Sequence, residues 1–162
     1  MALTRKNDMK TKYPLSGALA LLLSFALSIA QAEVVDIGNE QLKSLIKQGA
    51  PVVDLRTPGE WRQTGVVKGS QMITLFDEQG RADPAGWARQ LDKVAPAGKP
   101  VILICRTGNR SAVAAQMLDK AGRKGTVYNV KAGIVGWMGE NQAVVSLQDN
   151  LKQAGIACSP KC

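Results

Sequence analysis

The chain has 162 residues, enough for one domain with a substantial core, and a formal net charge of +8. It contains no histidine, which excludes a Ser-His-Asp triad, a Cys-His pair and a histidine-ligated zinc site. Its basic residues are spread among acidic ones and aromatic residues make up only 4%, so it lacks the basic stripe or stacking platform of a nucleic-acid-binding protein. The excess of positive charge is better suited to attracting small anions.

Residues 1–32 show the three parts of a secretory signal peptide. Basic residues precede an apolar run over 15–30, and Ala30-Gln31-Ala32 has the small-x-small form of a leader-peptidase site. Because the run is short for crossing a bilayer, we expect cleavage after Ala32 rather than a retained membrane anchor. The mature chain would start at Glu33 in the periplasm, as a monomer without stable membrane association. Translation could begin at either of two methionines, Met1 or Met9.

Short apolar strands alternate with amphipathic helices in the first half of the mature chain. We expect strands at three places, Val34–Asp36, Val52–Leu55 and Met72–Ile73. We expect helices at Asn39–Gln48 and Pro84–Val94, and a short helical turn starting at Thr57-Pro58-Gly59-Glu60, where an early proline is tolerated. A polar loop covers residues 77–83.

The most informative segment is the strand and loop around Cys105. Pro100–Ile104 is a continuous apolar run, typical of a strand buried on both faces. After the loop, Ser111 is expected to cap a helix. Loop N–H groups and the helix N-terminus would then converge on the sulfur, with Arg106 and Arg110 beside it. These conditions favour a thiolate nucleophile, whereas a cysteine that only packs in the core needs no flanking arginines.

The rest of the chain completes an α/β fold. We expect a last strand at Thr126–Val130 and a closing helix at Leu147–Gln153. The repeated alternation predicts a parallel sheet with helices on both faces. In such sheets ligands bind at the carboxyl ends of the strands, an edge that should carry Cys105, Arg56 and the Lys131-Ala132-Gly133 turn.

Three segments of the chain resemble the rhodanese-like sulfurtransferase family and occur in the family's order. They are the strand and acidic turn Val52–Trp61, the six-residue loop Cys105–Arg110 and the glycine-tryptophan segment Lys131–Trp137. The stretch 65–70 lacks a histidine that family members commonly carry there. The resemblance implies a rhodanese-like fold over residues 33–145. It also implies transfer of sulfane sulfur from a thiosulfate-like donor to cyanide or a thiol through a Cys105 persulfide, with no cofactor and no metal ion.

The candidate site residues divide by role. Cys105 is expected to be the nucleophile, and Arg106 to bind the sulfonate oxygens of the donor. The rest of the substrate-binding loop is Thr107, Gly108, Asn109, Arg110 and Ser111. Arg110 either faces the anion or turns back to Asp54 or Glu60. The remaining set, Asp54, Arg56 and Glu60, is expected to brace the loop, because carboxylates beside arginines are more often ion pairs than catalytic dyads.

Two other functions compete with sulfur transfer. Cysteine-dependent phosphatases and arsenate reductases resemble this arrangement but place five residues between cysteine and arginine. Here four residues, Arg106 to Asn109, lie between them, so the loop should fit a sulfur atom better than a tetrahedral phosphate. The third possibility is a non-catalytic rhodanese-like binding module, against which the cysteine, the glycine and both arginines argue.

Residues 146–162 form a tail that carries the closing helix and two more cysteines. We expect Cys158 and Cys162 to form a disulfide, because export leads to an oxidising compartment and Pro160 between them favours a turn. Two cysteines without histidine leave zinc short of ligands. The alternative is that one tail thiol accepts sulfur from the Cys105 persulfide or resolves a mixed disulfide.

Overall fold

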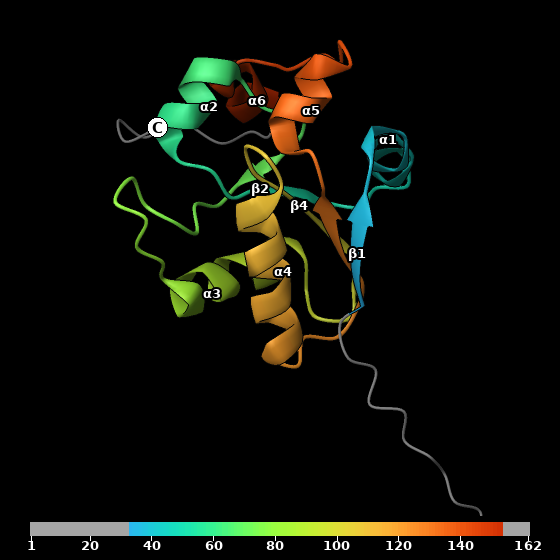
Figure 1. Ribbon diagram of the computed structural model, residues 1–162, viewed down its shortest axis with the longest axis vertical. Helices are drawn as coiled ribbons and strands as arrows, with labels where there is room; N and C mark the ends of the chain where they lie inside the picture. Colours follow the sequence, from blue (N-terminus) through green and yellow to red (C-terminus); the bar gives the residue numbers. More distant parts are fainter. Residues whose placement is uncertain (1–32, 154–162) are drawn as a thin grey trace, which may run out of the picture.

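The computed structural model describes residues 33–153, which form a five-stranded parallel sheet with helices packed on it (Figure 1). The strands are β1 (Val34–Ile37), β2 (Val52–Asp54), β3 (Gln71–Met72), β4 (Val101–Ile104) and β5 (Val127–Val130). Their order in the sheet is β1-β5-β4-β2-β3, and every pairing is parallel. The predicted α/β fold is therefore confirmed.

The helices cover both faces of the sheet and one of its ends. They are α1 (Asn39–Lys47), α2 (Pro58–Thr64), α3 (Pro84–Val94), α4 (Asn109–Lys120), α5 (Gly133–Gly139) and α6 (Leu147–Gln153). Buried residues of α3 and α4 pack on one face of the sheet, and those of α1 and α5 on the other. A third apolar cluster joins α2 to α6. Figure 1 shows α2, α5 and α6 gathered at the end of the sheet where α4 begins.

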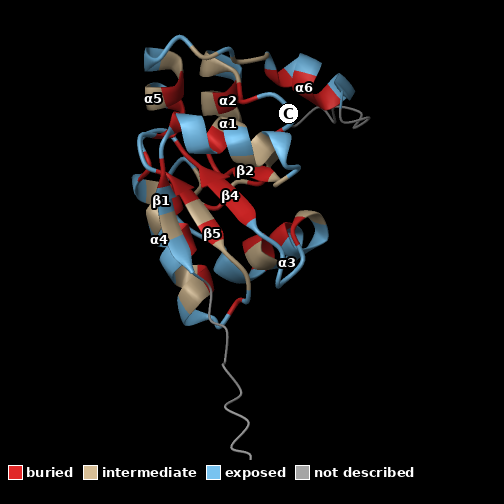
Figure 2. Cartoon of the chain, turned by 90° about the vertical axis from the view of Figure 1, so that its right-hand side faces the viewer, coloured by how far each residue is buried: buried red, intermediate tan, exposed pale blue. Residues whose placement is uncertain are grey.

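The alternation of side chains along β4 decides which face carries the cysteine. Leu103 and Cys105 belong to the core beneath α3 and α4, whereas Ile102 and Ile104 belong to the core beneath α1 and α5. All four strand residues are fully buried, as the continuous apolar run predicts, and the sheet lies inside the molecule in Figure 2. Each buried aliphatic side chain contributes about 1.5–3 kcal/mol, so β4 is anchored firmly beneath the loop that follows it.

The structure adds one helix to the predicted elements and lengthens another. No helix was predicted for Gly133–Gly139, whose first residue was expected in the Lys131-Ala132-Gly133 turn, yet the segment forms α5. Its three glycines give it a poor helix propensity. Burial of Ile134 and Trp137 against the sheet outweighs the poor local propensity. The expected turn at Thr57 is a seven-residue helix, α2. The other boundaries agree with the predictions or differ by one residue, apart from the start of α4.

Candidate active site

The loop after β4 turns sharply at Gly108 and passes directly into α4. Gly108 is the N-cap residue, with a φ of 88° in the left-handed region that favours glycine. A side chain at this position would overlap the carbonyl group of Lys131. The expectation that Ser111 caps the helix is therefore wrong: the glycine turn starts α4 at Asn109, and Ser111 lies inside the first turn.

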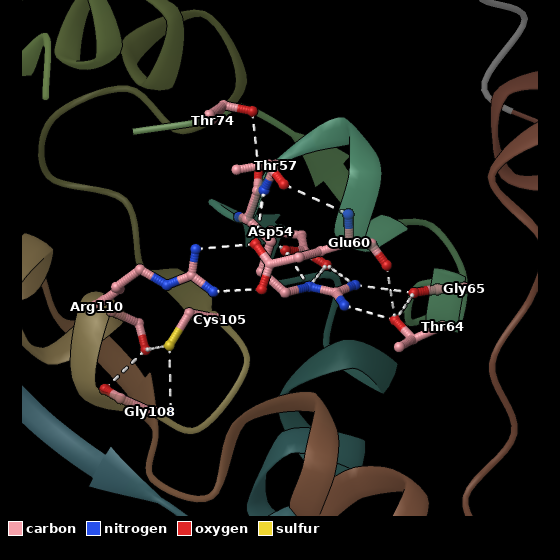
Figure 3. A network of polar contacts seen from close by, with 11 residues as sticks. Asp54, Thr57, Glu60, Thr64, Gly65, Thr74, Cys105, Gly108 and Arg110 are labelled. Carbon is pink, nitrogen blue, oxygen red and sulfur yellow. Dashed lines mark hydrogen bonds and ion pairs between the residues drawn. The ribbon is translucent and has the colours of Figure 1, made fainter. Parts of the chain in front are cut away.

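The sulfur of Cys105 lies on the inner side of this loop. The residue is a free cysteine that is only 1% exposed. The backbone N–H of Gly108 donates a hydrogen bond to Sγ at 3.1 Å (Figure 3). The Ser111 hydroxyl oxygen lies 3.4 Å from Sγ. The loop thus places the Gly108 N–H and the Ser111 hydroxyl oxygen beside a sulfur that is otherwise part of the apolar core.

The start of α5 holds the outer side of the loop. The N–H groups of Ile134 and Val135 donate to the carbonyl oxygens of Cys105 and Arg106, at 2.9 and 3.1 Å. Because C=O and N–H point in opposite directions in a trans peptide, the N–H groups of Arg106 and Thr107 point away from α5. The helix that composition did not predict therefore sets the orientation of the loop amides.

Most backbone N–H groups of the loop have no hydrogen-bond acceptor among the described residues. Five N–H groups of the loop and the first turn of α4 donate no hydrogen bond to any group within residues 33–153: those of Arg106, Thr107, Asn109, Arg110 and Ser111. They follow one another along the chain after Cys105, interrupted only by Gly108, whose N–H is bound to Sγ. Unpaired N–H groups of a loop and a helix start form an anion-binding site.

Arg110 turns away from the loop and binds Glu60. Its two terminal nitrogens donate to the two carboxylate oxygens at 2.9 and 2.5 Å (Figure 3). Glu60 also closes a capping box at the start of α2, because its Oε2 accepts from the N–H of Thr57 at 3.0 Å. Of the two expected placements of Arg110, the structure shows the one that holds the loop, with Glu60 and not Asp54 as its partner.

The contact shifts the pKa of both groups. Burial raises the pKa of Glu60, but hydrogen bonds from Arg110 and Thr57, with the charges of Arg110 and Arg56, bring it below its ordinary value of 4.5. The hydrogen bond to Glu60 raises the pKa of Arg110 above its ordinary value. At neutral pH the loop is therefore held to α2 by a fully ionised pair.

Glu60→Gln should lower the free energy of unfolding by about 1 kcal/mol at neutral pH, because a partly buried two-point ion pair is lost. A lowered carboxyl pKa contributes stability that is complete above 4.5 and lost as pH falls through the folded-state value. The difference between wild type and variant should therefore be constant above pH 4.5 and shrink below it. Urea unfolding across this range measures it, with Glu140→Gln at an exposed position as control. A difference that grows in acid would contradict the assignment.

Asp54 and Arg56 form a second, deeper ion pair. Both side chains are essentially inaccessible to solvent, with exposures of 0% and 1%. Arg56 Nη2 lies 2.7 Å from Asp54 Oδ2 and also donates to the Gly65 carbonyl oxygen, while Nη1 donates to Thr64. Figure 3 shows Asp54 beside Glu60, with Thr64 and Gly65 on the far side of the network. The ion pair of Asp54 and Arg56 joins the end of β2 to the end of α2 and so holds the helix that carries Glu60.

Three side chains of the loop face solvent: those of Arg106, Thr107 and Asn109. Within the described part of the chain, the guanidinium of Arg106 has no hydrogen-bond or ion-pair partner. Lys131, which follows β5 at the same edge of the sheet, is also exposed. The open side of the loop therefore carries free positive charge suited to an anionic ligand.

Several predictions from the sequence concern residues outside the described range. The leader at 1–32 and the pair Cys158 and Cys162 lie there. Within residues 33–153, no group of three or more candidate metal ligands comes together. The helices of this same range include none that combines the length and the hydrophobicity needed to span a bilayer.

Sequence reasoning missed two polar residues near the site. Asn129 on β5 and Asp36 on β1 lead to Ser111 through hydrogen bonds, although neither belongs to the loop. Asn129 interrupts the largely apolar strand Val127–Val130, and Asp36 interrupts Val34–Ile37. A polar residue within an apolar strand is the one sequence feature that could have indicated their role.

Comparison with known proteins agrees with this geometry. The family model for the rhodanese-like domain matches residues 38–140 of the chain. The chain is 33% identical over 127 residues to the uncharacterized protein YibN of Escherichia coli strain K12, covering 78% of this chain and 82% of that one. It is 29% identical over 119 residues to thiosulfate sulfurtransferase 18 of Arabidopsis thaliana, covering 71% and 86%.

Solved structures share the fold. Rv0390 from M. tuberculosis matches with a TM-score of 0.53 and 29% identity, covering 63% of this chain and 80% of that one. The polysulfide-sulfur transferase from Wolinella succinogenes matches with a TM-score of 0.55 and 24% identity, covering 72% and 82%.

Proposed function

Because the chain belongs to the rhodanese-like domain family, we propose that it transfers sulfane sulfur from a thiosulfate-like donor to a thiophilic acceptor, with Cys105 as nucleophile. One observation carries the proposal: the Gly108 N–H is bound to the Cys105 sulfur, and five neighbouring N–H groups of the loop and helix start are unpaired within residues 33–153. Such N–H groups can stabilise negative charge on a sulfur or its substrate without any proton-transfer group. The chain has no histidine to serve as a general base, so a reaction that needs none fits the site.

The reaction has two balanced steps. The Cys105 thiolate attacks the outer sulfur of thiosulfate, the S–S bond of the donor breaks, and sulfite leaves with the electron pair. The product is a Cys105 persulfide anion, which the loop amides stabilise. Cyanide or a thiolate then attacks the outer sulfur of the persulfide and restores the thiolate. Neither step needs a cofactor.

Intact mass spectrometry after thiosulfate treatment without reductant tests this proposal. We expect the protein to gain one sulfur atom on Cys105, and to lose it on addition of cyanide with formation of thiocyanate. An aryl phosphate serves as the second arm, because a phosphatase would hydrolyse it and take up no sulfur. Hydrolysis of the phosphate without persulfide formation would favour the phosphatase alternative. Inertness in both arms would favour a binding module.

Arg106→Ala should raise the KM for thiosulfate by about tenfold and lower kcat much less, because its guanidinium is free to bind donor oxygens before reaction. Steady-state kinetics over a range of thiosulfate concentrations measures both constants. Arg89→Ala, an exposed arginine on α3, is the matched control and should leave both unchanged. An equal loss of kcat and kcat/KM would place Arg106 in transition-state stabilisation instead.

We also propose that the protein is exported as a periplasmic monomer whose tail cysteines pair with each other. The support is the leader pattern in residues 1–32 and the spacing of Cys158 and Cys162. The intact mass of exported protein should correspond to a chain starting at Glu33 and lighter by two hydrogens. A mass that includes the leader would contradict cleavage, and two free tail thiols would contradict the disulfide. Size-exclusion chromatography of the same material tests the monomer.

A further inference from the structure

A line of polar contacts runs from the surface of β1 to the sulfur of Cys105. Asn129 Nδ2 donates to Asp36 Oδ1 at 2.8 Å. On its other side, Asn129 Oδ1 lies 2.6 Å from the Ser111 hydroxyl oxygen, which in turn lies 3.4 Å from Sγ. The sheet register explains the line, because Asp36 and Asn129 are direct partners on β1 and β5. Asn129 belongs to neither the loop nor α4 and has no place in the proposed reaction.

The orientation of the Asn129 amide follows from its neighbours. A carboxylate only accepts hydrogen bonds, so the NH₂ group of Asn129 must face Asp36. The amide oxygen then faces Ser111 and can only accept from it. Asn129 is 3% exposed, so water does not compete effectively for that oxygen. Asp36 is exposed and holds the amide from the edge of the sheet.

The Ser111 hydroxyl has one proton and three acceptors within reach. These are Asn129 Oδ1 at 2.6 Å, the Gly108 carbonyl oxygen at 3.0 Å and Cys105 Sγ at 3.4 Å. The shortest contact has the distance of a strong O–H to O hydrogen bond, so the proton goes to Asn129. Ser111 then turns lone pairs toward the sulfur. Lone pairs can accept from a thiol S–H, but they cannot stabilise a thiolate.

We propose that Asn129, oriented by Asp36, is a positioning residue that withholds the Ser111 proton from Cys105 and so limits the fraction of this cysteine present as thiolate. This role is distinct from that of the loop amides, whose N–H groups are the donors that stabilise the sulfur anion. It deepens the proposed sulfur transfer, yet it concerns the reactivity of Cys105 alone. Alkylation therefore tests it even if the sulfurtransferase proposal fails.

The other charged groups around the cysteine are common to wild type and variants. They are Arg106 and Arg110 on the loop and α4, Asp54 and Arg56 after β2, Glu60 on α2 and Lys131 after β5. Substitution of Asn129 alters none of them. Among the described residues, Asp36 is the one charged group that loses a partner when Asn129 is replaced, so the Ser111→Ala background is needed to attribute a change in the pH dependence of alkylation to the Ser111 proton.

The test is the rate of iodoacetamide alkylation of Cys105 across a range of pH, with Cys158 and Cys162 replaced by serine throughout. Leucine is close to asparagine in shape. At pH values where Cys105 is partly protonated, Asn129→Leu should raise the alkylation rate by about fivefold. That factor corresponds to the difference in free energy between a hydrogen bond to a charged group and one to a neutral group. The midpoint of the profile should move to lower pH by about half a unit or more. The rate at high pH should not rise.

A double-mutant cycle separates this role from packing. In a Ser111→Ala background, Asn129→Leu should no longer move the profile, because no proton remains to be released. Asp36→Ala is a surface change that does not endanger folding, and it should move the profile in the same direction. Asp36→Asn, which removes the charge but keeps an accepting oxygen, should move it less. An unchanged profile in both Asn129→Leu and Asp36→Ala, or a shift that persists without Ser111, would overturn the proposal.

Discussion

Replacing Cys105 with serine should reduce sulfur transfer from thiosulfate to cyanide by more than about 10³-fold. A serine hydroxyl is not ionised at neutral pH, and the chain has no histidine to remove its proton. The fold should be unaffected, because serine fills nearly the same space and can accept the Gly108 N–H bond. Thiocyanate formation measures the activity, and circular dichroism with thermal unfolding checks the fold.

The other two cysteines provide the matched control for this variant. The double variant Cys158→Ser, Cys162→Ser should retain transfer to cyanide and to a dithiol, with a modest loss of stability at most. Its Cys105 should still take up one sulfur atom from thiosulfate. Substantial activity in Cys105→Ser would refute the mechanism. Loss of turnover in the double variant, with persulfide trapped on Cys105, would instead make the tail the sulfur acceptor.

Asp54→Ala should lower the free energy of unfolding by about 3–5 kcal/mol, the largest loss of stability we expect from a single substitution in the site. Asp54 is fully buried and neutralises Arg56, which is only 1% exposed. Removing the carboxylate leaves a buried guanidinium without its counter-charge. Since whole domains are stable by only about 5–15 kcal/mol, urea unfolding should show a marked drop in the midpoint.

Two further variants separate the buried charge from loss of packing. Replacing both partners, Asp54→Leu with Arg56→Met, should recover most of the stability lost in Asp54→Ala, because no unpaired charge remains. Glu40→Gln, which breaks the exposed pair with Lys43, should change the midpoint little. If Asp54→Ala changes stability no more than Glu40→Gln does, the pair does not hold β2 to α2 as described.

The position of Cys105, the proposed nucleophile, could be predicted from the sequence. The apolar run before Cys105 is buried on both faces in every residue of β4, and a buried strand must end at the edge where its loop begins. Gly108 could likewise be predicted to adopt a left-handed conformation, since glycine does so without steric cost. These features depend on the hydrophobicity and backbone freedom of neighbouring residues, which a sequence contains directly.

The partners of the loop depended on tertiary structure. Glu60 and Arg110 are fifty positions apart, and Asp54 was an equally good partner by charge. Arg110 pairs with Glu60 because α2 directs Glu60 toward the loop, whereas Asp54 is already paired with Arg56.

The groups that contact Cys105 and its loop from β5 and α5 also depend on tertiary structure. Asn129 reaches Ser111 only because β5 lies beside β1 and β4 in a particular register, and α5 forms only because Ile134 and Trp137 find a buried surface. The sequence by itself determined the strand, the place of Cys105 at its end and the loop that follows. Packing decided which distant groups hold and tune them, because hydrogen bonds and ion pairs act over a few ångströms between elements that only the folded sheet brings together.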